Sequence, residues 1–194
     1  MDNGPMKSNA LPLISENYRA QQAQLHAQGN YGVMGEKHAG MVNAIIERMG
    51  VRHLLDYGCG SRCSLTRGLK ALHKLTYQAY DPGVPKFASP PVPAEMVCCI
   101  DVLEHIEPDY LDAVLDDLRR LTEAILFATV ATGPAGKTLS DGRNAHLTQQ
   151  PMSWWAPKFF DRFEVQTIQV LSPKDFLVIG YAKSQIQAVN GGLA

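Results

Sequence analysis

The amino-acid sequence predicts an α/β protein with a doubly wound, mostly parallel sheet that ends in an antiparallel hairpin. Two observations support this fold class. Short apolar segments that suit buried strands alternate with segments whose apolar residues recur at helical spacing. The last two apolar segments, in contrast, are separated by only a few residues, which is too short for a crossover helix. The strands are therefore expected to be parallel up to this final pair.

The first half of the chain shows the alternation clearly. Four elements are expected here in chain order: a helix over residues 36–49, a strand over 53–57, a helix over 64–73 and a strand over 76–80. A strand, helix and strand in succession predict a right-handed parallel unit. Five prolines between Asp81 and Glu95 then exclude a regular helix or a central strand. We therefore expect the third-strand region of the sheet to be shortened.

The second half continues the pattern. Six elements are expected: a strand over residues 96–100, a helix over 108–122, a strand over 124–130, a short helix over 152–160 and strands over 163–171 and 176–181. Pro108 suits the first turn of its helix, because a proline lacks the N–H that is unpaired there anyway. The loop between the strand that ends at residue 130 and the helix that begins at 152 is long enough to suggest a function.

Before these elements lies an N-terminal extension, which we place at residues 1–34, and after them a flexible tail at 185–194. Residues 15–26 read as a polar helix with Ser15 as its N-cap. Tyr31 lies in a Gly/Tyr/Asn break. It belongs either to a lid that closes over a bound cofactor or to an ordinary turn.

Composition excludes several classes of protein. The 194 residues are 45% hydrophobic and 19% charged, which is ordinary for one globular domain. A formal net charge of −1 disfavours the broad basic surface that binds nucleic acid. The four cysteines lack the spacing of a zinc site, so we expect reduced thiols in a cytoplasmic protein. The sequence holds no signal peptide and no run of 18 apolar residues, so no membrane partner is expected.

The strongest chemical signal is a glycine turn. The strand over 53–57 runs into Asp56, Gly58 and Gly60, and glycines allow a backbone to approach a ligand that a Cβ would obstruct. The expected helix behind the turn would offer free N–H groups to a polar ligand. Asp81 closes the next strand about 21 residues later, where its carboxylate can accept both hydroxyls of an adenosine ribose. A dinucleotide site would have a third glycine at position 63, where this sequence has Cys63, so a nicotinamide cofactor is disfavoured.

This turn and the later ribose acid resemble the first motifs of class I S-adenosylmethionine-dependent methyltransferases, whose turn has the form acidic-x-Gly-x-Gly. The resemblance implies a Rossmann-like methyltransferase domain, placed here at residues 35–184, and S-adenosylmethionine as cofactor. It also implies that Cys59, between the two glycines, belongs to the cofactor site. A later glycine of the family falls at Arg62, where the sequence departs from the pattern.

Residues 100–108, Ile-Asp-Val-Leu-Glu-His-Ile-Glu-Pro, resemble the segment after the fourth strand in methyltransferases of ubiquinone biosynthesis and related small molecules. The resemblance implies that Asp101 borders the methionine end of the cofactor and that Glu104 and His105 line the catalytic site. In the alternative interpretation Glu104 orients backbone groups and His105 is a satisfied, packed side chain.

The same residues also admit a metal. Asp101, Glu104 and His105 share one face if a helical turn begins here, and His146 would be a distant fourth ligand for a divalent cation. Small-RNA 2′-O-methyltransferases are similar, with Glu in place of the first residue. We favour a site without metal, so a metal-assisted RNA 2′-O-methyltransferase is the alternative function.

Acceptor chemistry is expected in the loop that carries Asn144 and His146. Either His146 takes a proton from the acceptor as a general base, or both residues hold the loop in place. The sequence is similar here to methyltransferases of small molecules and glycans, which have a histidine followed by a tryptophan pair, in this chain Trp154 and Trp155. The two tryptophans either line the acceptor pocket or belong to the core.

The resulting hypothesis is direct transfer of a methyl group to an oxygen or nitrogen of a small-molecule or glycan acceptor. The protein would contribute mainly alignment, with modest assistance from a base. A third hypothesis is a non-catalytic protein that binds S-adenosylmethionine as a sensor or partner subunit.

Overall fold

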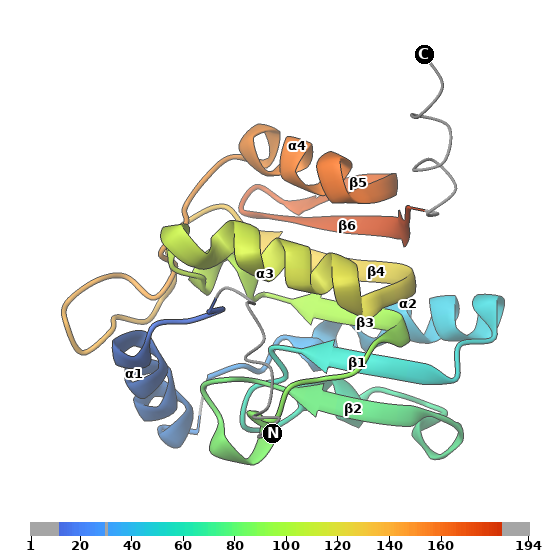
Figure 1. The fold of residues 1–194 in the computed structure, drawn as a ribbon, viewed down its shortest axis with the longest axis horizontal. Coiled ribbons are helices and arrows are strands. Elements are labelled where there is room, and N and C mark those ends of the chain that lie inside the picture. The colour runs from blue at the N-terminus through green and yellow to red at the C-terminus, as the bar shows by residue number, and fades with distance from the viewer. Residues whose placement is uncertain (1–11, 30, 184–194) are drawn as a thin grey trace, which may run out of the picture.

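The computed structural model describes residues 12–29 and 31–183. The tail predicted at 185–194 and the first part of the predicted extension lie outside the described residues. Six strands form one sheet in the order β2-β1-β3-β4-β6-β5 (Figure 1). Their bounds are β1 (His53–Tyr57), β2 (Thr76–Tyr80), β3 (Ala94–Ile100), β4 (Thr122–Ala131), β5 (Phe163–Ser172) and β6 (Asp175–Ala182).

Strand directions confirm the predicted fold class. β2, β1, β3 and β4 are parallel neighbours, whereas β6 runs antiparallel to β4 and β5 antiparallel to β6. The shortened third-strand region is also confirmed, because residues 81–93 contain only a 3₁₀ turn at Pro85–Phe87 and no strand. The chain therefore has a doubly wound sheet with an antiparallel hairpin at one edge.

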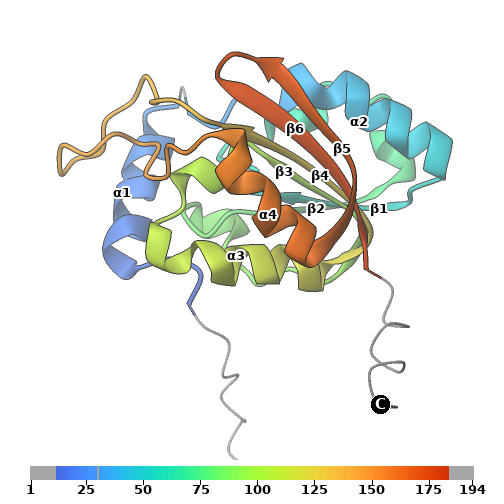
Figure 2. The same cartoon turned by 90° about the horizontal axis from the view of Figure 1, so that it is seen from above.

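Helices cover both faces of this sheet. The described residues form the α-helices α1 (Glu16–Ala27), α2 (Gly35–Met49), α3 (Pro108–Leu121) and α4 (Met152–Arg162). Figure 2 shows α2 on one face and α3 with α4 on the other, and each face buries its own apolar cluster. α1 lies beyond the carboxyl ends of the central strands, where parallel sheets bind ligands. None of the described helices is long and apolar enough to cross a membrane.

The helix predicted over residues 64–73 is wrong. The structure has two short 3₁₀ turns there, Ser64–Arg67 and Leu72–Lys74. The first turn ends at Gly68, which packs closely on α2, since a Cβ at this position would lie 2.4 Å from the Cβ of Ala39. The Gly68 carbonyl accepts a hydrogen bond from the Asn43 side chain instead of completing a helix. Close packing on α2 therefore overrides the local helical pattern.

Candidate functional site

A cavity of about 360 Å³ opens at the carboxyl ends of β1, β2 and β3. Its size is in the range of small-ligand sites. Five parts of the chain line it: the glycine turn after β1, Asp81 with the two residues that follow it after β2, the segment after β3, the loop after β4, and α1 with its flanking residues. The sequence predicted site residues in the first four of these, and for the N-terminal extension it offered only a possible lid.

The glycine turn requires both of its glycines. Gly58 has φ 77°, and a Cβ there would lie 2.3 Å from a methyl group of Val102. Gly60 has φ 64°, and a Cβ there would lie 3.2 Å from the carbonyl oxygen of Gly32. The helix N-terminus expected behind this turn is replaced by a four-residue 3₁₀ turn, which begins after Cys63 at φ 43°. The turn therefore presents backbone to the cavity without an α-helix behind it.

Two buried carboxyl groups lie beside the turn. Asp81 accepts a hydrogen bond from the Gly60 amide on one oxygen, at 3.0 Å, and from the Gly83 amide on the other, at 2.9 Å. Asp56 accepts a hydrogen bond of 2.6 Å from the Tyr77 hydroxyl, and burial raises its pKa to about 7. A carboxylate oxygen accepts about two hydrogen bonds, so each Asp81 oxygen keeps capacity for a ligand.

The segment after β3 places the next predicted residues. Asp101 lines the cavity in the left-handed region, at φ 59°, and its amide donates to the Thr129 carbonyl and hydroxyl. Glu104 is fully buried behind the cavity, where its carboxylate accepts the Ala131 amide and its carbonyl accepts the Thr148 amide. Glu104 thus holds both ends of the loop after β4, as the backbone-orienting interpretation predicts.

His105 is held in one tautomer by its neighbours. Its Nδ1 lies 2.8 Å from the Ala145 carbonyl oxygen and 3.0 Å from the Tyr31 hydroxyl. A carbonyl only accepts hydrogen bonds, so we assign the proton to Nδ1 and the free lone pair to Nε2. Burial, with a contribution from His146, lowers the pKa of His105 to about 4. His105 is therefore neutral at pH 7.

His146 is held in the same way. Its Nδ1 lies 2.6 Å from the Gly133 carbonyl oxygen, which leaves Nε2 as the acceptor. The rings of His105 and His146 meet edge to face, with centroids 4.6 Å apart. Asn144 fixes the loop by accepting the amides of Ala135 and His146 and by donating to the Ala135 carbonyl. His146 faces the cavity, and Asn144 makes the contacts that its loop-holding alternative predicts.

Three of the four residues in the predicted metal set come together. Potential ligand atoms of Glu104, His105 and His146 lie within 4.8 Å of one another, whereas Asp101 is not part of this group. Glu104 Oε2 is buried without a hydrogen-bond partner among the described residues. Both imidazoles donate through Nδ1 to carbonyls, which is how proteins orient metal-binding histidines. The donor set therefore fits a divalent cation.

The tryptophan pair lies away from the site, since neither ring lines the cavity. Trp155 is fully buried in the core between the sheet and its helices, which confirms the core interpretation for this residue. Trp154 is 38% exposed, and the ammonium group of Lys158 lies 4.9 Å from its ring centroid.

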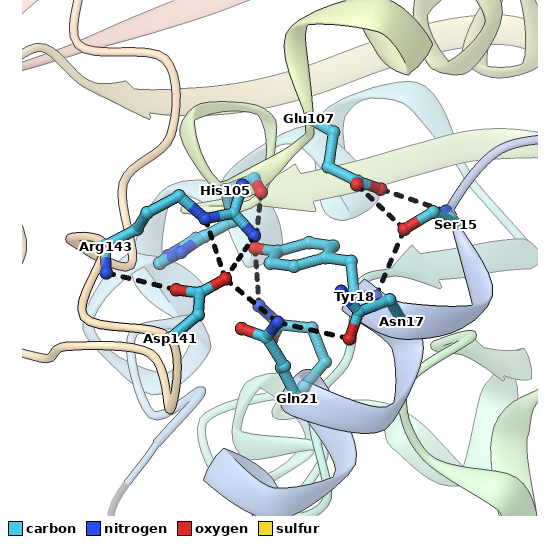
Figure 3. A network of polar contacts seen from close by, with 9 residues as sticks. Ser15, Asn17, Tyr18, Gln21, His105, Glu107, Asp141 and Arg143 are labelled. Carbon is cyan, nitrogen blue, oxygen red and sulfur yellow. Dashed lines mark hydrogen bonds and ion pairs between the residues drawn. The ribbon is translucent and has the colours of Figure 1, made fainter.

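α1 contributes polar residues that the sequence analysis missed. Figure 3 shows this helix facing the segment after β3 and the tip of the loop after β4. Ser15 is its N-cap, as predicted, and also donates to the Glu107 carboxylate, while Tyr18 donates to the His105 carbonyl. Gln21 donates to Asp141. Polar residues on a polar helix are expected to face solvent, so no local pattern in the sequence indicated that these residues contact the site.

No protein-family model matches the sequence, and no curated protein matches it. Several solved structures share its fold. The 1,6-didemethyltoxoflavin-N1-methyltransferase of Burkholderia thailandensis, solved with 1,6-didemethyltoxoflavin and S-adenosylhomocysteine, is 13% identical, with a TM-score of 0.65 over 90% of this chain and 93% of its own. Magnesium protoporphyrin IX methyltransferase of Synechocystis PCC 6803, with bound S-adenosylhomocysteine, is 15% identical, with a TM-score of 0.61 over 86% and 97%. The methyltransferase domain of bacterial CtHen1-C is 14% identical, with a TM-score of 0.57 over 78% and 100%.

Proposed function

We propose that this chain, which has the fold of class I S-adenosylmethionine-dependent methyltransferases, uses S-adenosylmethionine to methylate an oxygen or nitrogen of a small-molecule or glycan acceptor. One observation carries the proposal. The buried Asp81 carboxylate stands at the end of β2, fixed by two backbone amides and with capacity on both oxygens for the hydroxyls of a ribose. The glycine turn beside it lets backbone approach the same ligand.

The residues divide by position into a cofactor half and a reaction half. Asp56, Gly58, Cys59, Gly60 and Asp81 hold the cofactor in the first half. Asp101 borders both halves from the end of β3. The cofactor supplies an electrophilic methyl group when bound, so no covalent enzyme intermediate is needed.

His146 and His105 serve the reaction half. Each has its Nδ1–H committed to a carbonyl, so each presents Nε2 as a proton acceptor. His146 takes the proton that an acceptor hydroxyl or amine loses on methylation, and His105 packs against it in the neutral form. Glu104 supports both histidines by holding the loop and the segment that carry them. Assistance by a base of this kind contributes roughly 10²- to 10⁴-fold.

Apolar side chains in the cavity wall support a small organic acceptor. Ile106, Val114 and Pro134 lie on the side of the cavity formed by the segment after β3, α3 and the loop after β4. A net charge of −1 gives no general attraction for a polyanion. Two enzymes of the same fold are named for small-molecule acceptors, 1,6-didemethyltoxoflavin and magnesium protoporphyrin IX.

The experiment is a calorimetric titration with S-adenosylmethionine, with NAD as the ligand control. Asp81→Ala should abolish saturable binding, whereas Asp161→Ala, which removes an exposed carboxylate from α4, should leave it unchanged. Absence of binding to the wild-type protein, or a preference for NAD, would refute the proposal.

His146→Ala then separates catalysis from cofactor binding, because it should lower turnover much more than cofactor affinity. Binding without turnover on any acceptor of a screened panel would favour the sensor hypothesis.

A metal-assisted methyltransferase acting on RNA is the second candidate, and the cluster of Glu104, His105 and His146 is the observation that favours it. A bound divalent cation would polarise the acceptor oxygen. Titration with Co²⁺, followed by its visible absorption, tests the site directly. Saturable binding that is lost in His146→Ala, together with RNA methylation that EDTA abolishes, would favour this candidate over the metal-free one.

A further inference from the structure

His26 occupies an unusual position for a residue of a surface helix. It lies in the last turn of α1, lines the cavity, and is only 9% exposed. The other end of α1 is fixed by Ser15 on Glu107 and by Tyr18 on the His105 carbonyl. The imidazole is therefore directed into the site by a helix that is anchored at several points.

The ring lies on the glycine turn, next to the ribose acid. Its Nε2 is 3.6 Å from an Asp81 carboxylate oxygen, the same oxygen that accepts the Gly60 amide. Its Cε1 is 3.4 Å from the position that a Cβ on Gly60 would take and 3.5 Å from the corresponding position on Gly32. His26 thus packs where the glycine turn, at Gly60, meets the segment that follows α1, at Gly32.

Neither ring nitrogen has a hydrogen bond within the described part of the chain. The Nε2 contact with Asp81 exceeds hydrogen-bonding distance, and Nδ1 is buried without a partner. A buried polar atom without a partner is destabilising. The imidazole also packs against the ring of Tyr31, with ring centroids 4.9 Å apart, and this contact supplies no hydrogen bond to Nδ1. The arrangement is that of a side chain that completes its hydrogen bonds with a ligand.

We infer that His26 is a further cofactor-binding residue, which hydrogen-bonds a hydroxyl of the cofactor ribose beside Asp81. The inference rests on the proposed function, because it assumes that the cavity binds an adenosine-containing cofactor. A ribose has two neighbouring hydroxyls, and each is both a donor and an acceptor. Asp81 only accepts, whereas a neutral imidazole has one donor and one acceptor nitrogen. Burial lowers the pKa of His26, so this neutral form is present at pH 7.

The consequence is that α1 belongs to the binding site and is more than a cover. Loss of a hydrogen bond of this kind should lower affinity about tenfold. The loss should depend on the hydroxyl, because a hydroxyl that is absent from the ligand has no bond to lose. This dependence distinguishes direct contact from a general loosening of α1.

The test compares adenosine, 2′-deoxyadenosine and 3′-deoxyadenosine by calorimetric titration, alongside S-adenosylmethionine. His26→Phe keeps a planar ring and removes both nitrogens, and His26→Gln restores a polar group of similar reach. His53→Phe is the matched control, because His53 is exposed at the opposite end of β1. His26→Phe should weaken S-adenosylmethionine and adenosine about tenfold, His26→Gln less, and His53→Phe not at all. For the deoxyadenosine that lacks the contacted hydroxyl, wild type and His26→Phe should bind equally.

Equal adenosine affinity of wild type and His26→Phe would overturn the inference while leaving the proposed function intact. A loss of the same size for adenosine and for both deoxyadenosines would also overturn it, as would equal losses in the Phe and Gln variants. Failure of the wild-type protein to bind either adenosine or S-adenosylmethionine would instead refute the proposed function, and the inference with it.

Discussion

Gly58→Ala should destabilise the protein by roughly 2 to 5 kcal/mol, because two penalties coincide at this position. The residue has φ 77°, and a left-handed conformation costs a residue with a Cβ about 1 to 2 kcal/mol. The added methyl group would also lie 2.3 Å from Val102 Cγ2 and 2.9 Å from Val102 Cγ1. Forcing an extra carbon into a packed region costs about 1 to 3 kcal/mol more.

Two further variants separate these contributions. Gly50 has φ 67°, and apart from its two chain neighbours no described residue has an atom within 4 Å of the position of a Cβ, so Gly50→Ala measures backbone strain alone. Val102→Ala removes both clashing methyl groups, so it should relieve the steric part when it is combined with Gly58→Ala. The double-mutant cycle should therefore show a favourable coupling of about 1 to 3 kcal/mol.

Urea denaturation followed by circular dichroism measures the free energy of unfolding of the wild type and of all four variants, the double variant included. The geometric argument predicts that Gly58→Ala is clearly less stable than Gly50→Ala. Equal destabilisation by the two glycine variants, or simple additivity of Gly58→Ala and Val102→Ala, would refute the claim that the turn packs tightly against the segment after β3.

Three other predictions follow from the site. Asn144→Ala removes hydrogen bonds to the amides of Ala135 and His146 and to the Ala135 carbonyl, so urea denaturation should show a loss of roughly 1 to 4 kcal/mol; a change below about 0.5 kcal/mol would contradict the loop-holding role. His105 has a folded pKa of about 4, below its ordinary value near 6.5, so between these values the unfolded chain binds more protons and stability falls with falling pH. The free energy of unfolding of the wild type, relative to that of His105→Gln, should therefore fall by roughly 2 kcal/mol between pH 7 and pH 5. The same difference in unfolding free energy between the two proteins at both pH values would show that the imidazole protonates freely in the folded state. S-adenosylhomocysteine at about 100 times its Kd should raise the melting temperature by about 5 to 10 °C, as measured by differential scanning fluorimetry, and an unshifted transition at millimolar ligand would count against the cofactor site.

Sequence patterns within single segments predicted most elements of the fold correctly. The helix predicted over residues 108–122 is observed at Pro108–Leu121, because an apolar stripe with a proline in its first turn has few alternatives. The strand predicted over 53–57 is observed with the same bounds, and the final antiparallel hairpin follows from its short connection. The one element predicted wrongly, the helix over 64–73, failed at Gly68, where contact with α2 rather than local preference sets the backbone.

The same distinction, between patterns local to one segment and contacts between segments, applies to the site. The sequence by itself determined the glycine turn, the acid at the end of β2 and the segment after β3, because each is a run of residues attached to one predicted strand. Only the tertiary structure brought His26 to Asp81, Tyr18 to the carbonyl of His105 and the rings of His105 and His146 together. Tyr18 and His105 are 87 residues apart in the chain, and contacts over such a separation leave no periodic pattern to read. They arise from the way α1 and the loop after β4 pack across the ends of the strands, which is a property of the folded chain rather than of either segment.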